Sequence, residues 1–270
     1  MGMLIRNESP VTESQAWRKH FLDNSLTTQH LPWDDPYRLS AQERDAISHS
    51  IQQFQLGEGS HGRRLLKRGL RYSQRVDDPY FPRALHLFIK EEQRHSAHLL
   101  RFMQQQGIAP VSKHWVDSIF RHLRGLAGLE LSLRVLVTAE IIAVPYYRAL
   151  GRATKSPLLR ALSSRILADE GAHLRFQASM LRRVALSRIS LLARAVSRMH
   201  RLFLVATVCI VWLEHQSVFE AAGYRFARLL KESLLEFAAL DRASNPQHVR
   251  ARIPNSLRAE ATANSQTRRV

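Results

Sequence analysis

The stretches Glu92-Gln-Arg-His95 and Glu170-Gly-Ala-His173 decide how this sequence is interpreted, because each places Glu-x-x-His inside a long helical pattern. Residues three apart on a helix point to the same side. Each stretch therefore presents one carboxylate and one imidazole at a single point. Both pairs also interrupt the apolar stripe of their helix, where a charged side chain is costly unless it is paired or bound to metal.

Two further acids interrupt the apolar stripes of neighbouring predicted helices. Glu58 precedes Glu92, and Glu140 precedes Glu170, by similar intervals that suit a helix, a tight turn and an antiparallel return. The longer interval from Glu92 to Glu140 suits a single long crossover. Four glutamates and two histidines make a ligand set for two metal ions. The competing interpretation is that the acids face solvent in ion pairs, and Glu91 is a rival to Glu92 for the inward position.

Start and stop signals predict where the helices lie. Ser40-Ala-Gln-Glu43 is a capping box that opens the first helix, and Asp77-Asp78-Pro79 is an acid cap that opens the second. The predicted helical segments span 41–73, 77–107, 127–151, 157–185 and 188–238, with a short helix in the crossover over 108–125. We therefore expect three parts: an extended N-terminal arm (1–39), a helical bundle (40–240) and a disordered basic tail (241–270).

The order Glu, Glu-x-x-His, Glu, Glu-x-x-His resembles the ferritin-like di-iron carboxylate superfamily over about residues 41–185. The resemblance implies an all-α fold, a ferritin-like four-helix bundle with a long crossover, here with an extra C-terminal helical region. It implies two Fe ions, with Mn as an alternative, and these metal ligands: Glu58, Glu92, His95, Glu140, Glu170 and His173. It also implies O2, a small organic or lipid-like substrate and an electron donor protein as partners, and we expect a homodimer.

At several positions the sequence differs from known subfamilies of this superfamily, and these differences reduce the number of functions to consider. Leu99 stands where radical-forming reductase subunits have a Tyr, and Gln93 stands where bacterioferritins bind haem through a Met. Ile166 stands where the similar N-oxygenases carry an additional His. We therefore predict a di-iron, or iron/manganese, oxidase or oxygenase that activates O2 to oxidise an organic substrate. The alternatives are a ferroxidase or iron-handling protein, and a non-enzymatic helical binding protein with a basic face.

Three residues near the predicted ligands have sequence patterns that indicate a role at the site less strongly. Tyr147 lies two turns after Glu140 on the same face, where it either packs or forms a hydrogen bond with the site. His61 repeats the Glu-x-x-His spacing after Glu58, but a hydrogen bond to a ligand or a plain core position is favoured over metal ligation. Asp169 is expected to orient a ligand histidine.

Composition and charge indicate which surfaces the protein could contact and in which cellular compartment it is located. The formal net charge is +17, and the stretch Gly171–Leu213 holds seven Arg and no acid. Such a stretch either packs on the bundle with solvated Arg side chains, which we favour, or makes a peripheral contact with an anionic membrane. Its apolar run Leu202–Leu213 is too short for a membrane span, which needs about 20 residues. The single Cys209 and the absence of an apolar signal segment at the N-terminus (Met1–Ser14) predict a cytoplasmic protein.

Overall fold

A computed structural model describes residues 10–27, 30–112, 128–185 and 190–244, and within these ranges all regular structure is α-helical. The all-α prediction is therefore confirmed. The helices are α1 (Pro10–Leu26), α2 (Ala41–Glu58), α3 (Arg63–Val76), α4 (Phe81–Gln105), α6 (Leu129–Arg152), α7 (Pro157–Ala185), α8 (Ser190–Ala221) and α9 (Phe226–Ser244). The predicted crossover helix falls largely, and the basic tail almost wholly, outside the described residues.

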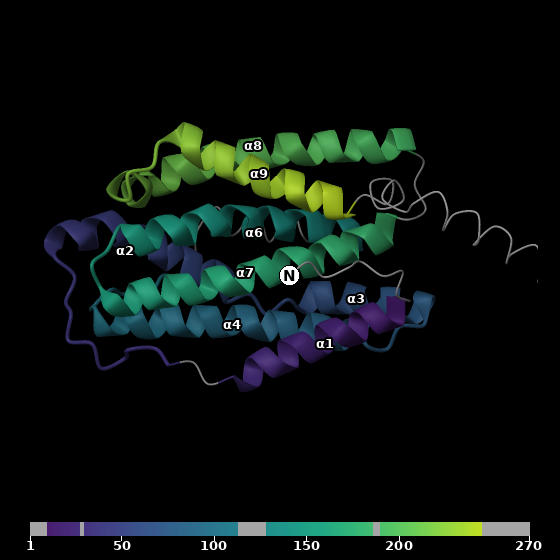
Figure 1. Ribbon diagram of the computed structural model, residues 1–270, viewed down its shortest axis with the longest axis horizontal. Helices are drawn as coiled ribbons and strands as arrows, with labels where there is room; N and C mark the ends of the chain where they lie inside the picture. The colour runs from purple at the N-terminus through teal and green to yellow at the C-terminus, as the bar shows by residue number, and fades with distance from the viewer. Residues whose placement is uncertain (1–9, 28–29, 113–127, 186–189, 245–270) are drawn as a thin grey trace, which may run out of the picture.

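The helices pack in layers around the elements that carry the predicted ligands. The helices α6 and α7, joined by a short connection, pack against each other as an antiparallel pair, while α2 and α3 pack against α4. The pair α8 and α9 covers α6 and α7 along one side of the molecule, and α1 lies across α4 on the other side (Figure 1). The core is apolar and includes the predicted stripe residues Leu85, Phe88, Leu99 and Phe102.

The helix start predicted at Ser40 is confirmed by hydrogen bonds. The Ser40 hydroxyl accepts the Glu43 N–H, and the Glu43 carboxylate accepts the Ser40 N–H, which is the capping box. Glu43 also accepts the Lys155 N–H at 2.6 Å, so it ties α2 to the α6–α7 connection. Burial opposes ionisation of Glu43, but these backbone N–H groups outweigh it and lower its pKa to about 2. The start predicted at Asp77 is wrong, because Asp77 ends α3 and α4 begins at Phe81, although Asp78 accepts the N–H groups of Tyr80 and Phe81.

The continuous helix predicted over 41–73 is wrong, because the chain breaks between Glu58 and Arg63. Gly62 adopts a φ of 57°, in the left-handed region that favours glycine. A Cβ at Gly62 would lie 2.4 Å from Cδ1 of Ile89. Glycine, which has no Cβ, therefore lets the backbone come closer to α4 than another residue type at position 62 would. The glycine-rich stretch thus ends α2 at Glu58 and starts a separate helix, α3.

The extended arm is also wrong for residues 10–26, which form α1. This helix packs along α4, and the buried Phe21 ring contacts the rings of Phe88 and Phe176 at centroid distances of 6.0 and 5.1 Å. Burial of these aromatic rings favours the docked helix. Residues 10–26 are therefore part of the folded structure and cover one side of α4 and α7.

The predicted fifth region, 188–238, is two helices, α8 and α9. One face of α8 is buried, with Leu204 and Val208 in the core, whereas Leu202 and Leu213 are exposed. The prediction that this stretch packs on the bundle is therefore correct for one face of α8. Within the described residues, Leu191–Ala221 is the one stretch long and apolar enough to cross a membrane, with 39% of its most apolar window buried. Such a stretch is weak evidence, because core helices of soluble proteins meet the same criterion.

Candidate metal centre

The structure brings all six predicted ligands together from four helices. Two overlapping groups have one ligand atom per residue within 4.8 Å of one another, and each group could hold a metal ion. Glu92 and Glu170 belong to both groups. Glu58 and His95 complete the first group, and Glu140 and His173 complete the second. The interpretation in which these acids face solvent is wrong, since all six side chains are largely or fully buried.

Several atoms of this cluster are buried without a hydrogen-bond partner. They are Nδ1 of both histidines, Oε1 of Glu92 and both carboxylate oxygens of Glu170. Nδ1 of His173 lies 2.8 Å from Oε1 of Glu92 and 3.5 Å from Oε2 of Glu170, which are ion-pair contacts without hydrogen-bond geometry. A buried polar atom without a partner costs about 1–3 kcal/mol. Cations in the two groups would give these atoms partners, and imidazole and carboxylate donors suit first-row transition metals.

The opposite nitrogen of each histidine contacts an acid from the other Glu-x-x-His helix. Nε2 of His95 lies 3.1 Å from Asp169 on α7, and Nε2 of His173 lies 3.0 Å from Glu91 on α4. An acid at this position places the proton on Nε2, so that the Nδ1 lone pair of a neutral ring points into the cluster. Asp169 therefore contacts a histidine as predicted. Glu91, the rival to Glu92, has the same role toward His173.

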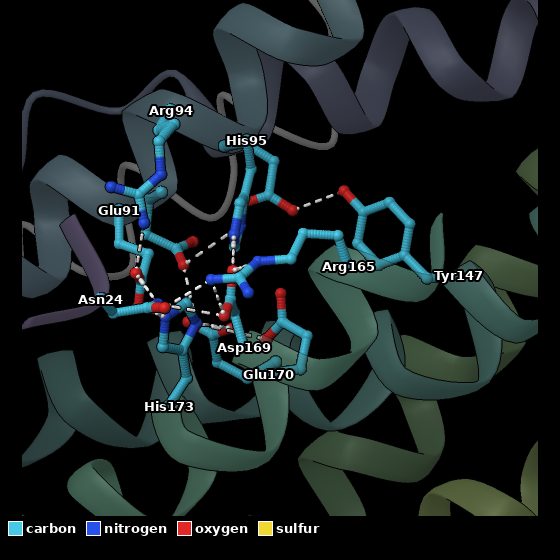
Figure 2. A network of polar contacts seen from close by, with 12 residues as sticks. Asn24, Glu91, Arg94, His95, Tyr147, Arg165, Asp169, Glu170 and His173 are labelled. Atoms are coloured by element: carbon cyan, nitrogen blue, oxygen red, sulfur yellow. Dashed lines mark hydrogen bonds and ion pairs between the residues drawn. The ribbon is translucent and has the colours of Figure 1, made fainter. Parts of the chain in front are cut away.

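An outer layer of charged and polar groups holds these two acids (Figure 2). Arg94 pairs with Glu91, and both nitrogens of the Arg165 guanidinium that face Asp169 lie within 3.2 Å of its oxygens. Asn24, from α1, donates to both acids and accepts from Arg165. A single amide on the N-terminal helix thus links the two acid–histidine pairs.

Burial and mutual repulsion of the carboxylates favour bound protons in this cluster. Burial raises the pKa of Glu92 well above its usual value, and the carboxylates of Glu140 and Glu58 raise it further. Burial and Glu140 raise the pKa of Glu170 in the same way. Burial alone would lower the pKa of His173, but the surrounding carboxylates, Glu92 first, raise it well above its usual value. Protons on these groups therefore offset the negative charge, and a metal ion would displace them.

The two lone glutamates are each held by one neutral donor. The Tyr147 hydroxyl donates to Oε1 of Glu58 at 2.6 Å, which confirms hydrogen bonding over simple packing for this tyrosine. Burial and the charge of Glu58 raise the pKa of Tyr147 well above its usual value, so it remains a donor. Nε2 of Gln177 donates to Oε1 of Glu140 at 2.9 Å.

Several residues fall outside the expectations. His61 is exposed and belongs to neither group, so both the core position and a hydrogen bond to a ligand are wrong for it. Asn24, Arg165 and Gln177 also contact the cluster or its neighbouring acids and were not predicted from the sequence. The sequence offers a local pattern only for the two acids that contact the histidines through Nε2, Glu91 and Asp169. Each of them directly precedes a Glu-x-x-His stretch.

No protein-family model, no curated protein and no solved structure matches this chain. The class of protein is therefore defined by the structure itself. It is an all-α protein with a buried cluster of glutamates and histidines that could hold a metal ion.

Proposed function

We propose that this chain is a ferritin-like di-metal protein that holds two iron ions, or iron and manganese, and oxidises an organic substrate with O2. The observation that carries the proposal is the contact between two halves of the bundle, of which one contains the Glu-x-x-His helix α4 and the other the Glu-x-x-His helix α7. Each half offers an inward Nδ1 whose ring is held through Nε2 by an acid of the other half. This arrangement supports two equivalent ion positions rather than one, and four helices with two Glu-x-x-His pairs are the pattern of di-iron carboxylate bundles.

Each residue of the cluster has a definite task in this proposal. His95 and Glu58 would hold one ion and His173 and Glu140 the other, and Glu92 and Glu170, which belong to both groups, would supply the remaining carboxylates. Iron held in this way supplies the chemistry of O2 activation.

The rest of the chain orients the ligands and excludes water. Asp169 and Glu91 hold the Nε2 protons of the two histidines, which keeps both Nδ1 atoms available. Phe88 packs edge-on against the ring of His173 at a centroid distance of 4.8 Å, and Phe21 lies 6.1 Å from the same ring. These rings close the α1 side of the cluster to solvent.

An oxidase or oxygenase is favoured over an iron-storage protein by a cavity of about 440 Å³ that reaches two of the acids, Glu58 and Glu92. A protein that only oxidises Fe(II) needs no space for an organic molecule beside its metal centre. The volume is within the range of roughly 300–1,000 Å³ that is common for small-molecule sites.

The test is metal stoichiometry in the full-length protein. After anaerobic reconstitution with Fe(II), elemental analysis should find close to two ions per chain, and one ion or none in folded protein would overturn the proposal. Replacing His95 or His173 with Ala should lower retention sharply. His98→Ala is the matched control, because this half-buried histidine lies one turn away, outside both groups, and should leave both ions in place.

Aerobic uptake separates this function from its alternatives. Uptake that stops at two iron ions per chain supports an oxidase or oxygenase, whereas continued accumulation indicates iron handling. Unchanged metal retention in both histidine variants contradicts the assigned ligands.

A further inference from the structure

The cavity beside the candidate metal centre lies where α2 ends and α3 begins. Glu58 and Glu92 line its buried end, and Phe88 and Leu136 line its walls. The first residues of α3, including Arg63 and Arg64, also line the cavity, and both side chains are exposed, so they lie at its rim. The two acids are called the floor of the cavity below and the two arginines its rim, and the rest of the lining combines apolar side chains with Ser60, His61 and Ser132.

The rim is suited to an anion for two reasons. Neither Arg63 nor Arg64 has an ion pair with any residue in the described part of the chain. The first turn of α3 has no acidic residue and no side-chain cap, because its N-cap is Gly62. Its free N–H groups and the positive end of its dipole add to the charge of the two guanidinium groups. Arginine in particular matches the two oxygens of a carboxylate.

The floor has the opposite preference. Neither Glu58 nor Glu92 offers a positive charge or a free donor group to a carboxylate, and Phe88 beside them offers apolar surface. A molecule with one acidic end and one apolar end therefore has a single favourable orientation in this cavity. Its acid group lies at the rim, and its apolar end lies next to the glutamates.

We propose that this cavity binds a compact organic acid, with its carboxylate held by Arg63 and Arg64 and its hydrocarbon part against Phe88 and Leu136. The inference concerns binding, and it rests on the proposed function above only for the reaction at the inner end of the bound molecule. It defines the substrate class as a monoanion with an apolar chain, rather than a cation, a neutral molecule or a free inorganic anion.

Binding can be measured with octanoate as the probe, and with octanol, octylamine and inorganic phosphate as matched alternatives. Titration calorimetry on the full-length protein, both metal-free and metal-loaded, should show saturable octanoate binding at least tenfold tighter than any of the three. Octanol binding as tightly as octanoate would overturn the role of the rim. Phosphate binding as tightly as octanoate would overturn the role of the apolar walls.

Variants locate the site. Arg63→Gln combined with Arg64→Gln should weaken octanoate binding at least tenfold and leave octanol unchanged. Arg71→Gln is the matched control, since this exposed arginine lies on α3 but does not line the cavity. Leu136→Trp should weaken both probes by filling the cavity, with circular dichroism reporting the fold. Unchanged octanoate binding in the double arginine variant contradicts the proposal.

Orientation provides a readout that depends on the metal. In protein loaded with Mn(II), the paramagnetic ion should broaden the NMR signal of the octanoate methyl group more than that of the carbon next to the carboxylate. The opposite order would overturn the orientation. If the protein retains no metal yet binds octanoate through Arg63 and Arg64, the proposed function fails and this inference stands. If it retains two ions and does not bind octanoate, this inference alone fails.

Discussion

Glu58 and Glu140 are the two lone acids of the candidate metal centre, and the protein encloses them in opposite ways. Glu58 is the last residue of α2, between two glycines and at the end of the cavity. Glu140 lies in the middle of α6, which continues beyond it to Arg152 and packs along α7. A further layer, α8 and α9, packs over α6 and α7 (Figure 1).

The difference shows how one ligand pattern can serve two purposes. Continuous helices on the α6–α7 side bury their ligands away from water. The broken helix on the α2–α3 side has the same kind of ligand, but the break leaves space beside it for another molecule. The α6–α7 side is called the closed half below, and the α2–α3–α4 side the open half.

The largest effect is expected where the halves meet. Glu92→Gln or Glu170→Gln should abolish retention of both ions, because each residue belongs to both ligand groups, whereas Glu58→Gln or Glu140→Gln should leave about one ion per chain. Elemental analysis after reconstitution checks this. The metal-free Glu170→Gln protein should melt no lower than the wild type, because the raised pKa of Glu170 means that the glutamine resembles the protonated acid. Loss of both ions in all four variants would contradict a division into two halves.

Much of this centre could be predicted from the sequence, because ligand spacing follows from helix geometry. The six ligands lie on apolar stripes, and residues three apart share a face. Asn24 could not be predicted, because its role depends on docking of α1 across α4, and an asparagine on a weakly patterned helix carries no local signal. The break after Glu58 depends on both the glycines and a long-range contact, since Ile89 leaves no space for a Cβ at position 62.

The next largest effect is expected in α8, which belongs to the layer that covers the closed half. His200, on α8, is buried against α6, where its Nδ1 lies 3.1 Å from Arg134 and its Nε2 lies 3.0 Å from the Thr138 hydroxyl. Burial, with the charge of Arg134 added, lowers its pKa to about 4. An unfolded histidine takes up a proton near pH 6.5. Between these values the unfolded chain binds more protons, so stability should fall as the pH falls from about 6.5 to about 4.

The loss attributable to His200 should reach roughly 3 kcal/mol. His200→Gln keeps a donor and an acceptor but cannot titrate, so its free energy of unfolding should decline less steeply across this range. Urea denaturation of both proteins in chelator, at pH 7 and at half-unit steps down to pH 4, isolates the difference. Parallel pH profiles would show that the covering layer does not depend on a neutral His200.

A smaller effect is expected at the break in the open half. Gly62→Ala should lower the free energy of unfolding by about 1–2 kcal/mol, because alanine is strained at a φ of 57° and its Cβ would collide with Ile89. Gly57→Ala is the matched control, since its Cβ would meet nothing within 4 Å, and alanine in a helix is more stable than glycine by up to about 1 kcal/mol. Urea denaturation of the metal-free proteins checks both. If the Gly62→Ala protein were as stable as the Gly57→Ala protein, the break would not be enforced by close packing.

The smallest effect compares the donors that hold the two lone acids. Tyr147→Phe removes the hydrogen bond to Glu58, and Gln177→Met removes the one to Glu140. Loss of a donor to a metal ligand typically weakens metal affinity by about 10–100-fold. Because the cavity reaches Glu58, water can replace the tyrosine hydroxyl, whereas Glu140 has no such access, and its oxygen would be left buried and unpaired. We therefore expect Tyr147→Phe to lie near the lower end of that range and Gln177→Met near the upper end, measured by chelator competition for each ion. The reverse order would mean that the half next to the cavity is the more tightly sealed one, and the distinction between an open and a closed half would have to be abandoned.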